Sequence, residues 1–138
     1  MNAISNLLFK FANSFDTKDW DGLKSTLMDH VECDYQDLRE KTDTCSKTEY
    51  VNSRKEALGH LKTQHLFSNL EIMSEEKCSY CRLSAIIYRQ DSNGKKFDSH
   101  VIYSFELSKS SNNEWKIQKI KQCVLWSEGD STIHKGVK

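Results

Sequence analysis

The chain has 138 residues, and its 20 basic and 20 acidic residues give a formal net charge of zero. This length fits one domain, and 37% hydrophobic with 29% charged residues is typical of a globular protein rather than a disordered one. Because the two signs of charge are interleaved, no basic field is available to hold phosphates, and we expect no nucleic-acid partner. No segment approaches the roughly 18–20 apolar residues of a membrane span, so we expect no membrane insertion.

The N-terminus, MNAISNLLFK, lacks the basic start and the long apolar run of a signal peptide. We therefore expect a cytoplasmic protein in a reducing compartment, with its five cysteines as free thiols. Cys78 and Cys81 form a CxxC pattern, but they fall in a strand-like segment rather than at a helix N-terminus. No second pair at zinc-ligand spacing exists in the sequence, so structural thiols and no metal site are the simpler interpretation.

The first part of the chain predicts two helices and a strand. Apolar residues spaced i, i+3, i+4 and i+7 predict an amphipathic helix formed around Ile4, Leu7, Leu8, Phe11, Ala12 and Phe15. Asp16 projects from the border of that buried stripe. A short helix is expected over about 18–28, capped by Asp16 or Thr17, and then a half-buried strand over 31–35.

A third helix and four strands follow. Residues 36–46 are polar and predict a loop, and Ser46 and Glu49 form a capping-box pattern that begins a helix continuing to Leu61. From His65 the hydrophobic period changes to two, which predicts strands over about 65–74, 77–90, 96–108 and 114–126. Residues 127–138 are polar and predict a loose tail, so we expect one domain over 1–130 and a tail over 131–138.

Helices followed by hairpin-connected strands indicate an α+β fold, with the helices packed on one face of a strongly curved antiparallel sheet. Three side chains of suitable chemistry lie at element junctions: the acid Asp16, the phenol Tyr35 and the imidazole His65. Such a set can converge on one pocket. The competing interpretations are a helix cap for Asp16, a core aromatic for Tyr35 and a backbone-bonded histidine for His65.

Four segments resemble the scytalone dehydratases and their SnoaL-like relatives: FANSFDTKDWDGLKSTL, ECDY, KTQHLFSN and NNEWKIQKIKQCVLWSEGD. The resemblance covers roughly Ile4 to Asp130. Its most specific pieces are the Asp-x-x-Asp-Trp-Asp run at 16–21 and Thr-Gln-His at 63–65. It implies the nuclear transport factor 2-like (cystatin-like) cone fold, with a conical pocket between the first helices and the sheet.

The resemblance also implies a lyase that eliminates water next to a ketone, without metal or organic cofactor. Asp16 and His65 would form the acid/base pair, and Tyr35 would polarise the carbonyl. We expect the substrate pocket to be lined by Phe15, Trp20, Tyr50, Phe67, Tyr88, Val101, Tyr103 and Trp126. His60, His30 and His134 are expected to be solvated.

The sequence departs from the family pattern at several pocket positions. The family's second pocket tyrosine is Phe15 here, without a hydroxyl, and its second pocket histidine falls at Tyr88 or Arg89. The family's serine and asparagine fall near Val101 and Tyr103, unless a shifted register brings in Ser104 or His100. The C-terminal segment that closes over the substrate in the family is short here.

These observations leave alternatives open. The first is a cofactor-independent lyase or isomerase acting on a small cyclic or polyketide-type ketone. The second is a non-catalytic protein or pseudoenzyme that binds a small hydrophobic ligand on the same fold. A third is a protein-interaction module working through the convex face of the sheet. Since the strands carry apolar residues on both faces, we also expect a homodimer or homotrimer.

Overall fold

The computed structural model describes residues 2–35 and 42–134. Its elements are the helices α1 (Asn2–Asp16), α2 (Trp20–Ser25) and α4 (Lys47–Leu58), the strands β1 (Leu27–Asp34), β2 (Thr42–Ser46), β3 (Lys62–Ser74), β4 (Cys78–Gln90), β5 (Phe97–Lys109) and β6 (Trp115–Gly129), and the short 3-10 helix η1 (Ser131–Ile133). The four long strands predicted from the period-two pattern are confirmed, each within three residues of its expected bounds.

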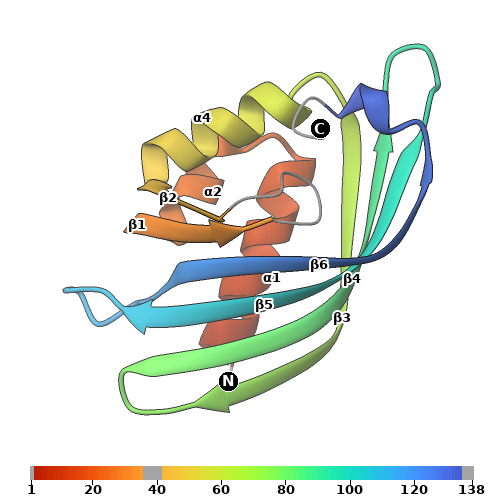
Figure 1. Cartoon of the computed structure of the whole chain (residues 1–138). Helices are drawn as coiled ribbons and strands as arrows, with labels where there is room; N and C mark the ends of the chain where they lie inside the picture. Colours follow the sequence, from red (N-terminus) through yellow and green to blue (C-terminus); the bar gives the residue numbers. More distant parts are fainter. Residues whose placement is uncertain (1, 36–41, 135–138) are drawn as a thin grey trace.

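The strands form one six-stranded sheet in the order β2-β1-β6-β5-β4-β3. The run β3-β4-β5-β6 is a meander of antiparallel hairpins, whereas β1 pairs parallel to β6 and antiparallel to β2. Register shifts interrupt β3 after Ser68 and β5 after His100, and each local irregularity bends the strands. The sheet therefore curves strongly, and all three helices lie on its hollow side (Figure 1).

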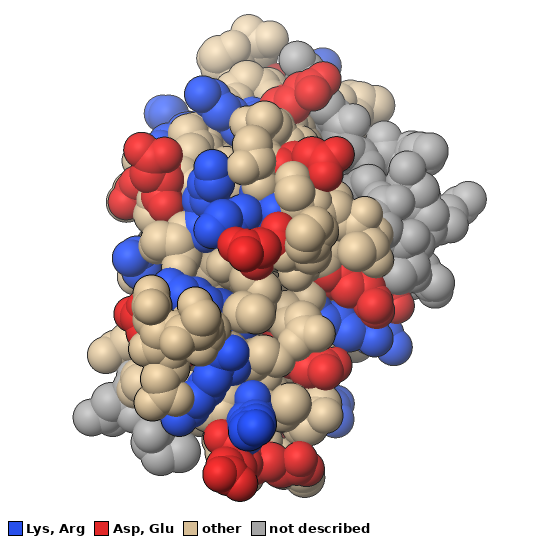
Figure 2. All heavy atoms as spheres, turned by 90° about the vertical axis from the view of Figure 1, so that its left-hand side faces the viewer, with Lys and Arg blue, Asp and Glu red and all other residues tan. Residues whose placement is uncertain are grey.

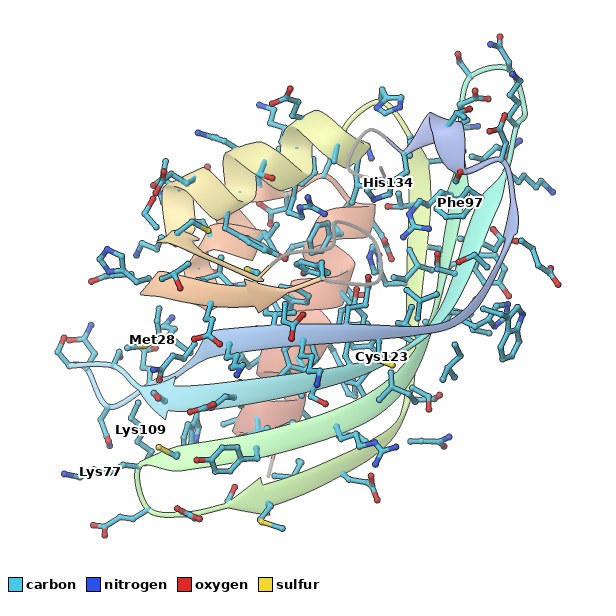
Figure 3. All side chains as sticks on the ribbon, viewed as in Figure 1. Met28, Lys77, Phe97, Lys109, Cys123 and His134 are labelled. Carbon is cyan, nitrogen blue, oxygen red and sulfur yellow. The ribbon has the colours of Figure 1, made fainter. Side chains whose placement is uncertain are left out.

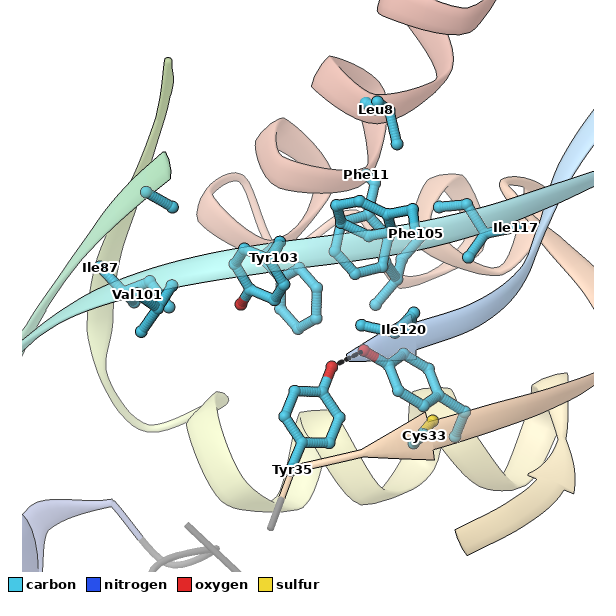
Figure 4. Packing of buried hydrophobic residues seen from close by; sticks show 14 of the residues in the cluster. Leu8, Phe11, Cys33, Tyr35, Ile87, Val101, Tyr103, Phe105, Ile117 and Ile120 are labelled. Atoms are coloured by element: carbon cyan, nitrogen blue, oxygen red, sulfur yellow. Dashed lines mark hydrogen bonds between the residues drawn. The ribbon is translucent and has the colours of Figure 1, made fainter. Parts of the chain in front are cut away.

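The core lies between α1 and the curved sheet. Phe11 packs edge-on against Phe15 and Phe105, with ring centroids 5.2 and 5.5 Å away. Leu8, Ile117 and Ile120 complete this apolar packing and are fully buried (Figure 4). The helical stripe predicted from residue spacing thus faces the sheet, which fixes where α1 ends and where Asp16 points.

The N-terminal region differs from the sequence-based prediction in three details. Asp19, rather than Asp16 or Thr17, caps α2, since its carboxylate accepts a hydrogen bond from the Gly22 amide. The helix ends at Ser25. The Thr26 hydroxyl donates a hydrogen bond to the Leu23 carbonyl, and the Thr26 carbonyl accepts one from the Ile117 amide of the sheet, so β1 begins at Leu27. The expected loop over 36–46 contains strand β2, while 36–41 lies outside the described residues. The capping box of Ser46 and Glu49 is confirmed.

The C-terminal prediction of a loose tail over 127–138 is wrong for the described part, up to His134. Strand β6 continues to Gly129, and η1 then folds back so that Ile133 and His134 are buried. Ile133 is held by a hydrogen bond from His60 Nε2 to its carbonyl oxygen (2.8 Å). Figure 3 shows His134 close to Phe97, where this turn meets the sheet. The prediction failed because it relied on the polar composition of the segment, whereas two of its residues, Ile133 and His134, are buried and anchor the turn.

On the face shown in Figure 2, lysine and arginine side chains are interspersed with aspartate and glutamate, as the interleaved sequence indicated. None of the helices in 2–35 and 42–134 is both long and apolar enough to cross a bilayer. The outer face of the sheet exposes several large apolar side chains: Leu66, Met73, Tyr80, Tyr88, Leu125 and Trp126. Association of subunits through that face stays a prediction.

Candidate active site

The acid and the histidine predicted from the sequence form a direct pair. Asp16 is the last residue of α1, and His65 lies near the start of β3, where the sheet passes the end of the helix. His65 Nδ1 is 2.7 Å from Asp16 Oδ1, and the His65 amide donates to Asp16 Oδ2 at 2.8 Å. Thr63 Oγ1 donates to the same carboxylate at 3.1 Å. Three donors therefore fix both carboxylate oxygens of Asp16.

This pairing defines the chemistry of the His65 ring. An ionised carboxylate only accepts hydrogen bonds, so Nδ1 donates and the neutral ring keeps its lone pair on Nε2. The ring is buried and lies against the Phe15 ring, with centroids 5.0 Å apart and planes tilted by 30°. A buried imidazole with a fixed tautomer and a carboxylate behind it is suited to accept a proton at Nε2.

His65 faces a small cavity of about 20 Å³, close to the volume that one water molecule requires. Its wall is formed by residues from α1, α4 and the strands β3, β4, β5 and β6, together with the residue that follows β1 and the residue that follows η1. The lining residues are Phe15, Tyr35, Arg54, Leu58, His65, Ile87, Arg89, Tyr103, Gln122 and His134. The structure thus brings His65 and Tyr35 to one cavity, with Asp16 directly behind His65.

Tyr35, the residue directly after β1, also lines the cavity. Its hydroxyl is 2.8 Å from the Tyr50 hydroxyl, a contact drawn in Figure 4. Burial raises the pKa of both phenols, with a further contribution to the pKa of Tyr35 from the charge that an ionised Tyr50 would carry. Both hydroxyls therefore keep their protons at neutral pH. Such a phenol acts as a hydrogen-bond donor to a developing oxyanion rather than as a base.

Tyr103 provides a second phenol. Its oxygen accepts a hydrogen bond from Gln122 Nε2 at 2.9 Å, which leaves its own proton available for another acceptor. Burial raises the pKa of Tyr103 to about 12, although the nearby Arg89 charge acts in the opposite direction. Gln122 Oε1 is buried without a hydrogen-bond partner. The cavity therefore offers donors and one free acceptor to a polar ligand.

Of the predicted lining residues, only Phe15 and Tyr103 contact the cavity. Tyr50 lies behind Tyr35, Trp20 packs edge-on against Phe15, and Phe67 packs on Tyr103 and His65. Val101 is a buried core residue next to this wall. These four support the wall without lining it.

The predictions for Tyr88 and Trp126 are wrong, because both side chains are on the outer face of the sheet, 41% and 52% exposed. Side chains alternate along a strand, so the inward position next to Tyr88 belongs to Arg89. His100 stacks on Trp126 on the same outer face, with ring centroids 4.1 Å apart. Ser104 alternates outward likewise. Neither His100 nor Ser104 replaces a pocket residue of the family.

Three polar lining residues were not predicted from the sequence: Arg54, Gln122 and His134. A fourth, Arg89, was one of the two positions expected for the family's second pocket histidine. The signal available for Arg54 is its place among apolar residues at helical spacing, since Tyr50, Val51, Arg54, Ala57 and Leu58 are the buried residues of α4. His134 was expected to be solvated, but it is 3% exposed. Burial lowers the pKa of His134 to about 3, assisted by the charges of Arg89 and Arg54. It is therefore a neutral ring at the cavity wall.

The cysteines do not contribute to this site. Cys81 is buried, and burial raises the pKa of its thiol, which is the opposite of what a reactive cysteine needs. No disulfide is recorded between cysteines in the part of the chain that the structure describes. Within 2–35 and 42–134, no three His, Cys, Asp or Glu side chains come together in a way that could hold a metal ion.

Comparisons with known proteins extend this description. The chain is 26% identical over 135 residues to a scytalone dehydratase of Colletotrichum orbiculare, which covers 89% of this chain and 72% of that protein. A dehydratase-type activity is thus present among its relatives.

Two solved structures have the same fold. A protein of the NTF2-like family from Streptomyces avermitilis superposes with a TM-score of 0.77 at 10% identity, covering 91% of this chain and 96% of that one. The hexachlorocyclohexane dehydrochlorinase LinA-type3 from Novosphingobium barchaimii gives a TM-score of 0.75 at 16% identity, covering 96% and 91%. The expected α+β cone fold is confirmed. The SnoaL-like domain matches residues 1–121, and the chain belongs to that family.

Proposed function

We propose that the protein is a cofactor-independent lyase, or an isomerase using the same proton chemistry, that acts on a small cyclic ketone. The observation that carries this proposal is the pairing of Asp16 with His65 beside a cavity that Tyr35 also lines. A scytalone dehydratase relative supports an elimination reaction. Asp16, His65 and Tyr35 are the proposed catalytic residues.

The proposed reaction begins with proton removal next to the ketone. His65 Nε2 takes the proton, and the electrons of the broken C–H bond move into an enolate whose oxygen accepts a hydrogen bond from Tyr35. Asp16 stabilises the imidazolium that forms. The imidazolium then protonates a leaving hydroxyl, so that a carbon–carbon double bond forms and water departs. In the isomerase variant, the proton returns to a different carbon.

Substrate entry requires a change in the cavity, because 20 Å³ is far too small for a ring compound. The turn formed by η1 and His134 contributes one part of the wall. It is held by the His60 bond to Ile133, by burial of Ile133 and by the edge contact of His134 with Phe97. We propose that displacement of this turn admits the substrate.

A non-catalytic binding protein is the second candidate, and the closed cavity and the Phe15 ring favour it. Its expected hydrophobic ligand fits less well, since seven of the ten lining residues carry polar or ionisable side chains and only Phe15, Leu58 and Ile87 are purely apolar. Two of those seven are arginines. A binding function on this cavity would therefore need a polar ligand.

Enolisation separates the two candidates, because it reports proton removal without requiring knowledge of the leaving group. Scytalone and simple cyclic ketones are incubated in deuterium oxide, and exchange of the α-protons is followed by NMR. We expect catalysed exchange by the parent protein, reduced about 10²–10⁴-fold in His65→Ala. His30→Ala, which removes an exposed histidine on β1 outside the cavity, should keep the rate of the parent. An equal rate in His65→Ala would exclude His65 as the base.

A further inference from the structure

Two guanidinium groups, those of Arg54 and Arg89, lie on the cavity wall. Arg54 comes from α4 and Arg89 from β4, so the fold brings them together from opposite sides of the cavity. The residues are 5% and 3% exposed, among the most buried polar residues of the described chain. Burying a charge is costly unless it is paired, so these two positions need a physical explanation.

Among the described residues, the hydrogen-bond partners of these groups are all neutral. Arg89 Nη1 donates to Ser99 Oγ at 3.0 Å and to the Phe97 carbonyl at 3.4 Å, and Arg54 Nη2 donates to Ser53 Oγ at 3.4 Å. The Nε atom of each arginine is buried and has no hydrogen-bond partner within 2–35 and 42–134. Both groups therefore keep unused donors in the interior.

An aromatic ring contacts each guanidinium group. The Arg54 Cζ lies over the Tyr35 ring at 5.5 Å from its centroid, and the Arg89 Cζ lies over the Phe97 ring at 4.9 Å. Such a cation–π contact stabilises the cation, and the N–H donors of a guanidinium lie in the plane of the group. A planar anion in the cavity is the natural acceptor for donors in that arrangement.

The charge balance of the cavity also favours an anionic ligand. No carboxylate lines it within the described chain, and Asp16, behind the wall, is already held by His65 and Thr63. Burial lowers the pKa of Arg89 to about 10, and the charge of Arg54 lowers it further, whereas an ionised Tyr103 and the Asp98 carboxylate on β5 act in the opposite direction. Arg89 therefore remains a cation at neutral pH. His134 next to the two arginines is neutral. The wall thus holds two cations whose charges a single anionic ligand would largely offset.

We propose that Arg54 and Arg89 form a carboxylate-binding site, so that the ligand is a small ring compound bearing a carboxylate group. The inference rests on the proposed function only in assigning this ligand as the substrate. A carboxylate between the two guanidinium groups would place the attached ring toward His65 and Tyr35 on the rest of the wall. Arg54 and Arg89 would then be binding and positioning residues, which select an acidic ketone over a neutral one.

Benzoate and benzamide provide a matched pair of probes, because they share one ring and differ in charge. Their binding to the full chain is measured by calorimetry and by thermal unfolding at constant ionic strength. We expect benzoate to bind and to raise the unfolding temperature, and benzamide to do neither at the same concentration. Equal binding of the two probes, or no binding of benzoate, would overturn the proposal without any variant.

Variants then assign the binding to the two arginines. Arg89→Gln and Arg54→Gln should each weaken benzoate binding about tenfold or more, the loss expected for a charge-assisted hydrogen bond. The matched control is Arg82→Gln, since Arg82 lies on the same strand but is exposed on the outer face. It should leave benzoate binding unchanged. Unchanged binding in both interior variants would overturn the assignment.

Two readouts distinguish this site from a merely structural role and from the proposed reaction. Without ligand, Arg89→Gln should unfold at the same or a higher temperature, because a buried unpaired charge is removed. A large drop would indicate that Arg89 serves the fold. His65→Ala should still bind benzoate in preference to benzamide, because both arginines remain. If the protein binds benzoate but catalyses no α-proton exchange, the proposed reaction is wrong and the anion site stands. If it catalyses exchange equally well for ketones with and without a carboxylate, the anion site is wrong and the reaction stands.

Discussion

The space between α1 and the sheet has two ends that are equally buried but built from different chemistry. At one end, Leu8, Phe11, Leu107 and Ile117 are at most 1% exposed and present only hydrocarbon to one another. At the other end, around Arg89, the buried side chains are phenols, a histidine pair and guanidinium groups. The same helix and the same strands serve both ends.

This difference shows where stability comes from and where function is placed. Removing apolar surface from water stabilises the fold by about 25 cal/mol per Å². Burying a charged or partly unsatisfied group costs free energy instead. We infer that the apolar end supports the fold, while the polar end is retained for what it binds. Exposed ion pairs such as Lys119–Glu32 contribute little to either.

The sharpest test of this division is Phe11→Ala at the apolar end. The loss of a fully buried ring that contacts Phe15 and Phe105 should lower the free energy of unfolding by about 3–5 kcal/mol. Chemical denaturation measures this change. Phe9→Ala is the matched control, because Phe9 is on the same helix but 41% exposed. It should change the free energy by about 0.5 kcal/mol or less. Equal losses in the two variants would contradict the division.

At the polar end, Asp16→Asn should reduce activity more than stability. The amide can present an N–H to His65, which would favour the tautomer whose Nε2 carries the proton and so remove the base. We expect the enolisation rate to fall about a hundredfold, equivalent to about 2.7 kcal/mol. Asp29→Asn, which affects only an exposed pair with Lys47, is the control. An unchanged enolisation rate in Asp16→Asn would show that Asp16 does not contribute to proton removal.

The smallest expected effect concerns the turn that covers the polar end. Burial lowers the pKa of His134 to about 3. Protonation of His134 is therefore easier when the η1 turn has moved away from the sheet than when His134 is packed against it. The stabilisation of the packed turn is therefore complete above about pH 6.5 and decreases as the pH falls from there toward 3. The positive charges that face this ring are Arg89, Arg54 and, when protonated, His60.

Hydrogen exchange of the Ile133 and His134 amides measures this release, with correction for the intrinsic pH dependence of exchange. Protection should weaken by about 1–2 kcal/mol between pH 7 and pH 5. In His134→Asn, the same interval should show little change, because asparagine does not titrate. A pH dependence that persists in this variant would assign the effect to another group.

The sequence predicted much of the fold, for local reasons. The stripe of α1, the capping box of α4 and the alternation of β5 are periodic patterns within single elements, and all three are confirmed. The approach of Asp16 to His65 was also anticipated, because each residue stands at the end of an element. The proposed roles of Asp16, Tyr35 and His65 remain predictions.

Tertiary structure decided what faces the cavity. A shift of one residue exchanges the two faces of a strand, and here the strand pairing turned Arg89 inward and Tyr88 outward. Arg54 and His134 reach the same cavity from segments 80 residues apart, a proximity that depends on how α4 and the C-terminal turn fold over the sheet. Sequence by itself therefore determined the elements and one acid–histidine pair. The charge of the site emerged only when these distant segments packed together.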